Sequence, residues 1–179
     1  STYTNVFAGM TTEGSFTNFI VLNNKVYIFN DSADSVRTID NANVASTVAA
    51  IPNGRFPVFH KGYLFVWGNP NTNLNRLQWS DRNAPETWTS TNIEDISAND
   101  GLGAGGAFSF GDELILFKAT YIGGAYKNAK MFRVLGDTFD AQNPTYRIEQ
   151  VLLLNNIGPL GYRTMKIFKG ALVFMTNDG

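Results

Sequence analysis

The stretch RFPVFHKGYLFVWG, residues 55–68, decides the fold class of this chain. It places two apolar segments on either side of Lys61-Gly62, a dipeptide suited to the positive backbone φ angles of a two-residue hairpin turn. The segment after the turn, YLFVW, is apolar throughout, which is typical of a strand covered on both of its faces. Residues 55–68 therefore predict a β-hairpin whose second strand lies inside the protein.

Three further segments repeat this pattern of an apolar strand, a two-residue turn and a second, strongly apolar strand. They are Asn18–Asn30, Gly106–Lys118 and Arg163–Gly179, which turn at Asn23-Asn24, Gly111-Asp112 and Lys169-Gly170. The four copies lie roughly 37, 50 and 58 residues apart, close to the repeat length of about 40 to 50 residues found in propeller blades.

We therefore expect an all-β chain in which residues 1–179 form a single domain or a fragment of one. The repeats predict an irregular β-propeller of about three and a half blades, part of a larger propeller because closure needs at least about four. The alternative is a β-sandwich-like array of hairpins. The only helix that the periodicity suggests is one or two turns within residues 44–52. The less apolar segments SVRTI, NRLQWS, KMFRVLG and TYRIEQVLLL are expected as outer strands.

The composition excludes several classes of function. The formal net charge is -1, so no basic excess favours binding to a phosphate backbone. The chain has no cysteine and a single histidine, His60, which excludes thiolate sites and histidine-rich metal sites. No apolar run has the length of about 18 residues that a membrane span needs. We expect no nucleic-acid sequence recognition, no membrane span, no metal, no cofactor and no catalytic residue.

Three connected stretches together resemble a family of tailed-bacteriophage virion proteins, irregular β-propellers of the head-tail junction or tail nozzle. They are YIFNDSADSVRTID, then FPVFHKGYLFVWG with NRLQWSDRNAPETW, and then DGLGAGGAFSFGDELILFKATYIGGAY followed by NIGPL and GALVFMTNDG. The chain departs from the family pattern at Asp31 and Asn41, which stand where the family has glycine. Asp and Asn tolerate left-handed turns, so the turn geometry is expected to survive.

This resemblance implies a non-enzymatic structural component of a phage or prophage neck or tail. The propeller would act as a scaffold for protein-protein assembly with other virion proteins, and as a ring-forming homo-oligomer in the full-length context. The protein would be made in the bacterial cytoplasm and end in the virion. Two alternatives stay open: a carbohydrate-binding or glycosidase-like propeller, and a bacterial propeller interaction module. A glycosidase would need a suitably spaced carboxylate pair, for which the candidates are Glu94, Asp95, Asp100, Asp112 and Glu113.

The segment NRLQWSDRNAPETW, residues 75–88, offers two interpretations. Trp79 and Trp88 could stack on a sugar while Asp81 and Arg82 hydrogen-bond it. The favoured interpretation is a structural corner, in which Asp81 accepts backbone hydrogen bonds, Pro85 fixes φ and Trp88 covers the turn. The segment also faintly resembles the Asp-box hairpin of sialidase-like propellers, although the glycine of that box is missing.

Oxygen-bearing side chains at Asn30, Asp34 and Asp40 could hold a calcium ion, but their spacing does not fit an EF-hand loop. Since Asn and Asp are also common turn residues, we favour structural turns at these positions. His60 lies beside the Lys61-Gly62 turn, where we expect it to be partly exposed rather than a catalytic base.

The glycine-rich stretch GLGAGG, residues 101–106, precedes a strand and opens no helix. It therefore predicts close packing of neighbouring elements rather than a dinucleotide loop. Residues 118–132 and 137–147 are candidate contact insertions, in which Tyr121 and Tyr126 are possible ligand or interface residues, together with Trp79 and Trp88.

Overall fold

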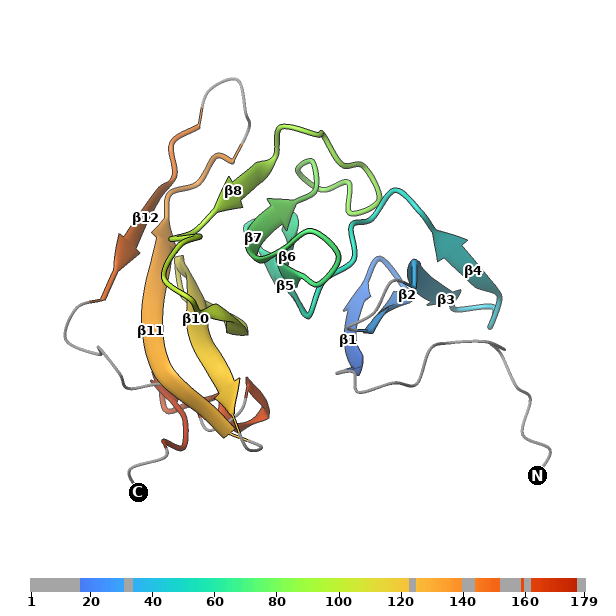
Figure 1. The fold of residues 1–179 in the computed structure, drawn as a ribbon. Helices are drawn as coiled ribbons and strands as arrows, with labels where there is room; N and C mark the ends of the chain where they lie inside the picture. The colour runs from blue at the N-terminus through green and yellow to red at the C-terminus, as the bar shows by residue number, and fades with distance from the viewer. Residues whose placement is uncertain are drawn as a thin grey trace.

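The computed structural model describes residues 17–30, 34–122, 125–139, 144–151, 159 and 162–176, and these form an all-β structure (Figure 1). Each sheet is antiparallel, and strands that follow one another in the chain pair with one another. No helix in the described residues has the length and apolar character needed to cross a membrane. The prediction of an all-β chain built on hairpins is confirmed.

Three four-stranded sheets and one hairpin follow each other along the chain. The first sheet contains β1 (Thr17–Leu22), β2 (Lys25–Asn30), β3 (Val36–Asp40) and β4 (Ala45–Val48). The second sheet contains β5 (Phe56–His60), β6 (Tyr63–Asn69), β7 (Asn73–Trp79) and β8 (Ile93–Asp95). The third sheet contains β9 (Gly103–Phe110), β10 (Glu113–Ile122), β11 (Ala125–Leu135) and β12 (Arg147–Gln150). The short 3-10 helix η2 (Tyr162–Thr164) precedes the terminal hairpin, β13 (Lys166–Phe168) and β14 (Ala171–Val173).

The four predicted hairpins form where their turn residues adopt positive φ. Asn23 and Asn24 have φ of 50° and 60°, and Lys61 and Gly62 have φ of 48° and 88°. Such paired positive angles match the right-handed twist of the flanking strands. Gly111 and the pair Lys169-Gly170 also have positive φ, so each of the four turns has the backbone geometry that its sequence predicts.

The second strands of the two middle hairpins, β6 and β10, divide their side chains between two neighbouring sheets. Counted from the turn, the second and fourth residues face the preceding sheet, and the third and fifth face the following one. In β6, Leu64 and Val66 pack against the first sheet, while Phe65 and Trp67 pack toward the third. In β10, Leu114 and Leu116 pack toward the second sheet, while Ile115 and Phe117 pack toward the terminal hairpin. This alternation follows from the two-residue period of a β-strand.

Three apolar cores fill the spaces between successive sheets. The core between the first and second sheets contains Tyr27, Phe29, Val36, Ile51, Leu64 and Val66. The larger core between the second and third sheets includes Phe65, Trp67, Leu77, Trp79, Leu116, Phe132 and Phe139. The core against the terminal hairpin contains Ile115, Phe117 and Met165. Because β6 contributes to two cores, it is buried along its whole length, as its continuous apolar sequence predicts.

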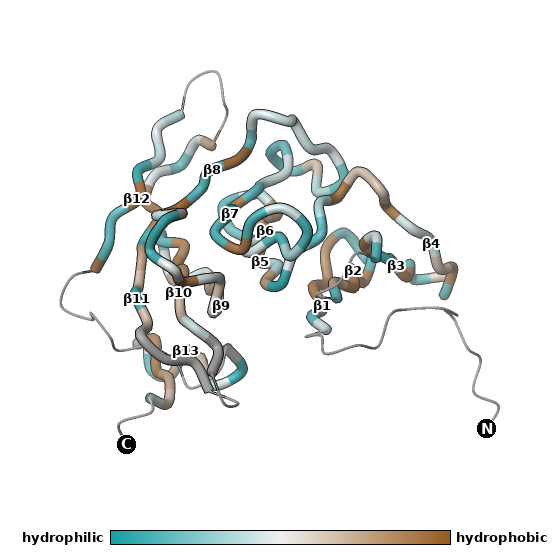
Figure 2. Tube along the Cα trace, in the orientation of Figure 1, coloured by the Kyte–Doolittle hydropathy of each residue, from teal (hydrophilic) through white to brown (hydrophobic). Residues whose placement is uncertain are grey.

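The sheets follow one another along an arc, with the first sheet and the terminal hairpin at its two ends (Figure 1). Their first strands lie side by side on the inner side of this arc, since β1 contacts β5 and β5 contacts β9. Figure 2 shows apolar segments at both ends of the arc, around β1 and β2 and near β13.

Residues 44–52 depart from the prediction of a short helix. They form strand β4 and the turns around it, and β4 pairs with β3. The Asp40 carboxylate accepts hydrogen bonds from the backbone N–H groups of Ala42 and Val44, at 2.9 and 2.8 Å. This capped turn directs the chain back along β3, and Val48 then packs on the first core. Tertiary pairing here outweighs a weak helical pattern.

The glycines before the third hairpin allow close packing, as predicted. A Cβ atom at Gly103 would lie 3.2 Å from the Cβ of Leu74 in the second sheet. One at Gly105 would lie 3.3 Å from the Cβ of Ala119 in the paired strand. Both distances are tighter than an ordinary van der Waals contact, so β9 approaches its neighbours more closely than larger residues would permit.

Candidate functional site

Trp79 and Trp88, the pair that suggested a sugar platform, lie in different cores. Trp79 in β7 is 1% exposed and lies in the core between the second and third sheets. Trp88 packs, half-buried, on the core between the first and second sheets, and its indole donates to the Pro85 carbonyl at 2.9 Å. Because Trp79 has no face open to solvent, the two rings cannot share one ligand.

The corner at residues 81–88 is held by hydrogen bonds, although its pattern differs from the predicted one. The Asp81 carboxylate accepts hydrogen bonds from two side chains, Thr89 at 2.9 Å and Asn92 at 3.2 Å, where backbone donors were expected. The backbone of Asp81 bonds to the carbonyl oxygen of Thr87 at 2.8 Å. Pro85 is buried at this corner. Asp81 thus anchors the chain segment that returns to β8.

Asn30, Asp34 and Asp40 do not form one ion-binding group. Asn30 donates to the Asp34 carboxylate at 2.8 Å at one end of the first sheet. Asp40 pairs with Lys25, at the opposite end of β2 from Asn30, so about 17 Å of strand separates the two ends. Among the residues that the structure describes, no cluster of three or more His, Asp or Glu side chains could hold a metal ion.

Tyr121 and Tyr126 lie opposite one another near the far end of the β10–β11 hairpin, and their side chains lie outside the described part of the structure. In the described part of residues 118–132, β10 and β11 continue as paired strands with a register shift between Lys118 and Thr120. The second candidate insertion, residues 137–147, is not simply an exposed loop. Phe139 is 1% exposed and stacks on Tyr146 at a centroid distance of 5.2 Å, so this part of the segment belongs to the core.

His60 is buried rather than partly exposed, because its side chain points between the second and third sheets. Only 3% of the residue is exposed, and its Nδ1 lies 2.8 Å from the Ser109 hydroxyl. Its buried Nε2 has no hydrogen-bond partner among the described residues. Burial lowers the pKa of His60, and Lys61 lowers it further, while Asp112 and Asp137 act in the opposite direction. His60 is therefore neutral at pH 7.

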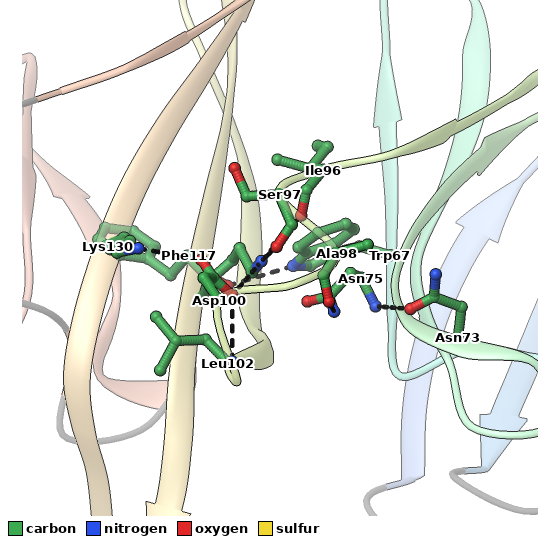
Figure 3. Close-up of polar contacts among 11 residues, drawn as sticks. Trp67, Asn73, Asn75, Ile96, Ser97, Ala98, Asp100, Leu102, Phe117 and Lys130 are labelled. Atoms are coloured by element: carbon green, nitrogen blue, oxygen red, sulfur yellow. Dashed lines mark hydrogen bonds and ion pairs between the residues drawn. The ribbon is translucent and has the colours of Figure 1, made fainter.

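Lys118 is the residue that nothing in the sequence singled out, and its hydrogen bonds to Ile96, Ser97 and Asp100 hold the connection between the second and third sheets; Figure 3 labels these three partners. Its side chain is fully buried, and its ammonium donates to the carbonyls of Ile96 and Ser97 and to the Asp100 carboxylate, each at 2.8 Å. Lys130 pairs with the other Asp100 oxygen at 3.1 Å. All three donor positions of the ammonium are thus used.

The electrostatics around Lys118 favour a fixed ion pair over proton transfer. Burial lowers the pKa of Lys118, while the hydrogen bond and charge of Asp100 oppose this change. Burial would raise the pKa of the Asp100 carboxyl, but hydrogen bonds from Lys118, the Leu102 backbone and Lys130 hold it below its ordinary value. The only sequence signal for this site was a lysine at the end of an apolar strand.

A second polar cluster joins the first sheet to the corner at residues 81–88. The Glu86 carboxylate accepts hydrogen bonds from Lys25 at 2.8 Å and from the Tyr27 hydroxyl at 2.9 Å. The hydrogen bond from Lys25 is the main reason that the pKa of Glu86 lies below its ordinary value. Burial, followed by Glu86, raises the pKa of Tyr27. This cluster fixes the first sheet against the second.

Three of the five carboxylates considered for glycoside hydrolysis, Glu94, Asp95 and Asp100, bond to other side chains. Asp95 forms a two-bond ion pair with Arg76 at 2.8 Å, and this pairing keeps its pKa low. Glu94 accepts a hydrogen bond from Tyr146, whose pKa is raised to about 12 by burial and by Glu94. A general acid for glycoside hydrolysis needs a raised carboxyl pKa, and those of Asp95 and Asp100 are lowered.

An apolar groove of about 760 Å³ runs along the inner side of the arc. It is lined by the first strands of the three sheets and by the segment around Met165, and includes Phe19, Val21, Phe59 and Phe108. Phe19 and Val21 are 63% and 68% exposed. The groove thus offers an apolar surface, and the polar side chains of Ser109, Arg163 and Lys166 lie along it.

Comparison with known proteins adds no relative to this picture. No protein-family model matches the chain, and neither a curated protein nor a solved structure matches it. The functional conclusion therefore depends on the geometry of the chain and on its sequence motifs.

Proposed function

We propose that the chain is part of an irregular β-propeller and serves as a non-enzymatic scaffold for protein assembly in the neck or tail of a phage or prophage particle. One observation carries this proposal: β6 and β10, the second strands of the two middle hairpins, send alternate side chains to the sheet before them and to the sheet or hairpin after them. Blades that succeed one another around an axis require this two-sided packing.

The order of the strands supports a propeller over a β-sandwich. In a sandwich, two sheets cover one another on one face each. Here the second and third sheets are covered on both faces, and each sheet is complete before the next begins. Each four-stranded sheet would be one blade, and β13–β14 would begin a fourth. The neighbouring first strands β1, β5 and β9 would then surround the propeller axis.

The described polar clusters support a scaffold role. Lys118 with Asp100, and Glu86 with Lys25 and Tyr27, each join one sheet to the next. Such clusters fix the angle between blades, which a component of a symmetric particle needs. The separation of Trp79 from Trp88 also removes the main feature that favoured a sugar-binding propeller.

The assignment to a phage particle depends on the order of the motifs along the chain, and a direct experiment can test it. Particles induced from the organism that encodes the chain would be purified on a density gradient and probed with an antibody against it. We expect the chain to sediment with the particles and the antibody to label the neck or tail. A chain found only in the cellular fraction would contradict the virion assignment and favour a bacterial interaction module.

A further inference from the structure

The groove on the inner side of the arc has an apolar end and a polar end. The strands β1, β5 and β9 and the hairpin that begins with β13 follow one another along this side (Figure 2). The side chains that β1 and β5 contribute to the lining are all apolar. The polar lining residues, Ser109, Arg163 and Lys166, come from β9 and from the segment that enters the terminal hairpin. The groove is therefore amphipathic along its length.

The apolar part of the groove includes a residue that lies between complete sheets. Phe59 in β5 lines the groove and is 39% exposed, although the second sheet is packed on both of its faces. The exposure of Phe59 therefore belongs to the inner side of the arc and not to an uncovered face of a sheet. In a larger propeller, further inner strands would continue this lining around a central channel. Phe59 thus offers an aromatic contact surface to an apolar ligand.

The polar end of the groove is positively charged. Lys166 is exposed at the start of β13, and Met165 next to it packs in the same core as Phe108 of β9. This packing holds Lys166 on the β9 side of the groove. Among the described residues that line the groove, none is an aspartate or a glutamate. The charge at this end therefore favours an anionic group in a ligand.

Ser109 supplies a hydrogen-bond donor at the same end. Its hydroxyl oxygen lies 2.8 Å from Nδ1 of His60, which is buried behind it between the second and third sheets. A hydroxyl group accepts and donates hydrogen bonds at the same time, and a hydrogen bond to an ionised acceptor is stronger than a neutral one. Ser109 can therefore accept a hydrogen bond from His60 and donate its own hydrogen to an anion in the groove.

We propose that the groove binds a small amphipathic carboxylate, whose hydrocarbon chain packs on Phe59 and the apolar lining around it and whose carboxylate bonds to Lys166 and Ser109. The volume of about 760 Å³ lies within the range of about 300–1,000 Å³ that is usual for small-molecule sites. A hydrocarbon chain fits the apolar end because the side chains there have no group that could compensate a polar ligand for lost water. The site adds ligand binding to the assembly role and does not rest on it.

Titration calorimetry with three ligands tests both parts of the site. Decanoate, kept below its micelle-forming concentration, should bind the wild type with a Kd of about 10–100 µM. Hexanoate should bind at least about 10-fold more weakly, because each methylene group that is no longer buried weakens binding by up to about fourfold. Decyltrimethylammonium has the same chain length with a cationic head, and it should bind at least about 10-fold more weakly than decanoate because its charge repels Lys166.

Two variants with matched controls locate the site. Phe59→Ser removes the aromatic contact, and its control is Ile93→Ser, which removes an apolar side chain of similar exposure, 37%, from β8 of the same sheet. Lys166→Gln removes the charge, and its control Lys169→Gln removes one from the adjacent turn. The groove variants should bind decanoate at least about 5-fold more weakly, and the controls should stay within about 2-fold of the wild type. Near-UV circular dichroism checks that each variant keeps its aromatic core.

A wild type that does not bind decanoate at about 1 mM would overturn the inference. Equal binding of hexanoate and decanoate would also overturn it, because that result indicates an adventitious anion contact at surface lysines only. Decyltrimethylammonium that binds like decanoate, or controls that lose as much affinity as the groove variants, would indicate unspecific adsorption and count against the site. A chain that fails to bind decanoate, exceeds 19.7 kDa in light scattering and returns to that mass in Phe59→Ser would assign the groove to a contact between copies instead.

Discussion

The indole Nε1 of Trp79 donates a hydrogen bond to the carbonyl oxygen of Phe139 at 2.6 Å and so ties the second sheet to the segment after β11. The two rings also meet edge-on at a centroid distance of 6.2 Å. Residues 60 apart in sequence are thereby joined in the middle of the largest core.

We expect Trp79→Ala to reduce the free energy of unfolding by about 3–5 kcal/mol, because it leaves a large cavity and an unpaired carbonyl. Trp88→Ala should cost less, about 2 kcal/mol or below, because Trp88 is only half-buried. Urea denaturation followed by circular dichroism measures both values. Equal losses in the free energy of unfolding would show that the two tryptophans stabilise the fold to the same extent. The assignment of Trp79 to the main core would then be wrong.

Lys118→Met should destabilise the protein by about 3 kcal/mol or more. The substitution keeps the apolar stem but leaves the Asp100 carboxylate and two carbonyl oxygens without their buried donor. The matched control is Lys130→Met, which removes a partly exposed partner of the same carboxylate and should cost about 1 kcal/mol or less. A Lys118→Met variant with an unchanged free energy of unfolding would mean that this cluster does not hold the second and third sheets together.

Stability should fall as the pH falls below about 6.5, the ordinary pKa of histidine. Burial lowers the pKa of His60 in the folded state, so the unfolded chain takes up its proton first. The stability that neutral His60 contributes is complete above the pKa of histidine in the unfolded chain. It is lost as the pH decreases toward the lower pKa of His60 in the folded protein. His60 is the only histidine, and the pKa values of Glu86, Asp95 and Asp100 are lowered, so these carboxyl groups titrate below this pH range.

Urea midpoints measured between about pH 7.5 and 5 would reveal this slope, with His60→Gln as the comparison. The variant should lose most of the slope even if it is less stable overall. A slope of the same size in His60→Gln would assign the pH dependence to other groups.

Gly68→Ala should be strongly destabilising, by more than about 2 kcal/mol. Gly68 has a φ of 79°, and a Cβ atom there would overlap the Cβ of Ala104 in β9. Gly170→Ala is the control, because it has a similar φ of 76° but nothing within 4 Å of the added atom. It should cost only the backbone strain, about 1 kcal/mol. Thermal unfolding measures the loss of stability of the two variants, and the difference between them reports the steric overlap at Gly68. Equal decreases in unfolding temperature would contradict close packing at Gly68.

The hairpins could be predicted from the sequence because their signals are local. Asn23-Asn24 and Lys61-Gly62 are residue pairs that readily adopt the positive φ angles of a two-residue turn, so they predict the turns directly. The continuous apolar run YLFVW predicts a strand that is covered on both faces. The helix predicted within residues 44–52 is wrong because the helical pattern of these residues is weak. They form β4 instead, whose conformation is set by pairing with β3 and by the turn at Asp40.

The side-chain environments were less predictable because they depend on which sheets meet. His60 next to a turn gave no sign that Ser109, from another sheet, would cover it. Trp79 and Trp88 are near in sequence, yet the pleat and the corner send them to separate cores. From the sequence, Lys118 is a charged residue at the end of an apolar strand, a position that is usually exposed. It is buried in an ion pair only because residues 96–100 pass over its ammonium.

Within each sheet, every strand pairs only with its neighbours in the chain, so each sheet is hydrogen-bonded from a short, continuous segment. During synthesis a sheet can therefore close before the residues of the next one have left the ribosome. The second sheet then docks on an apolar surface that already exists, and the third docks on the second. Folding is expected to proceed from the N-terminus toward the C-terminus, with docking between sheets as the slow step.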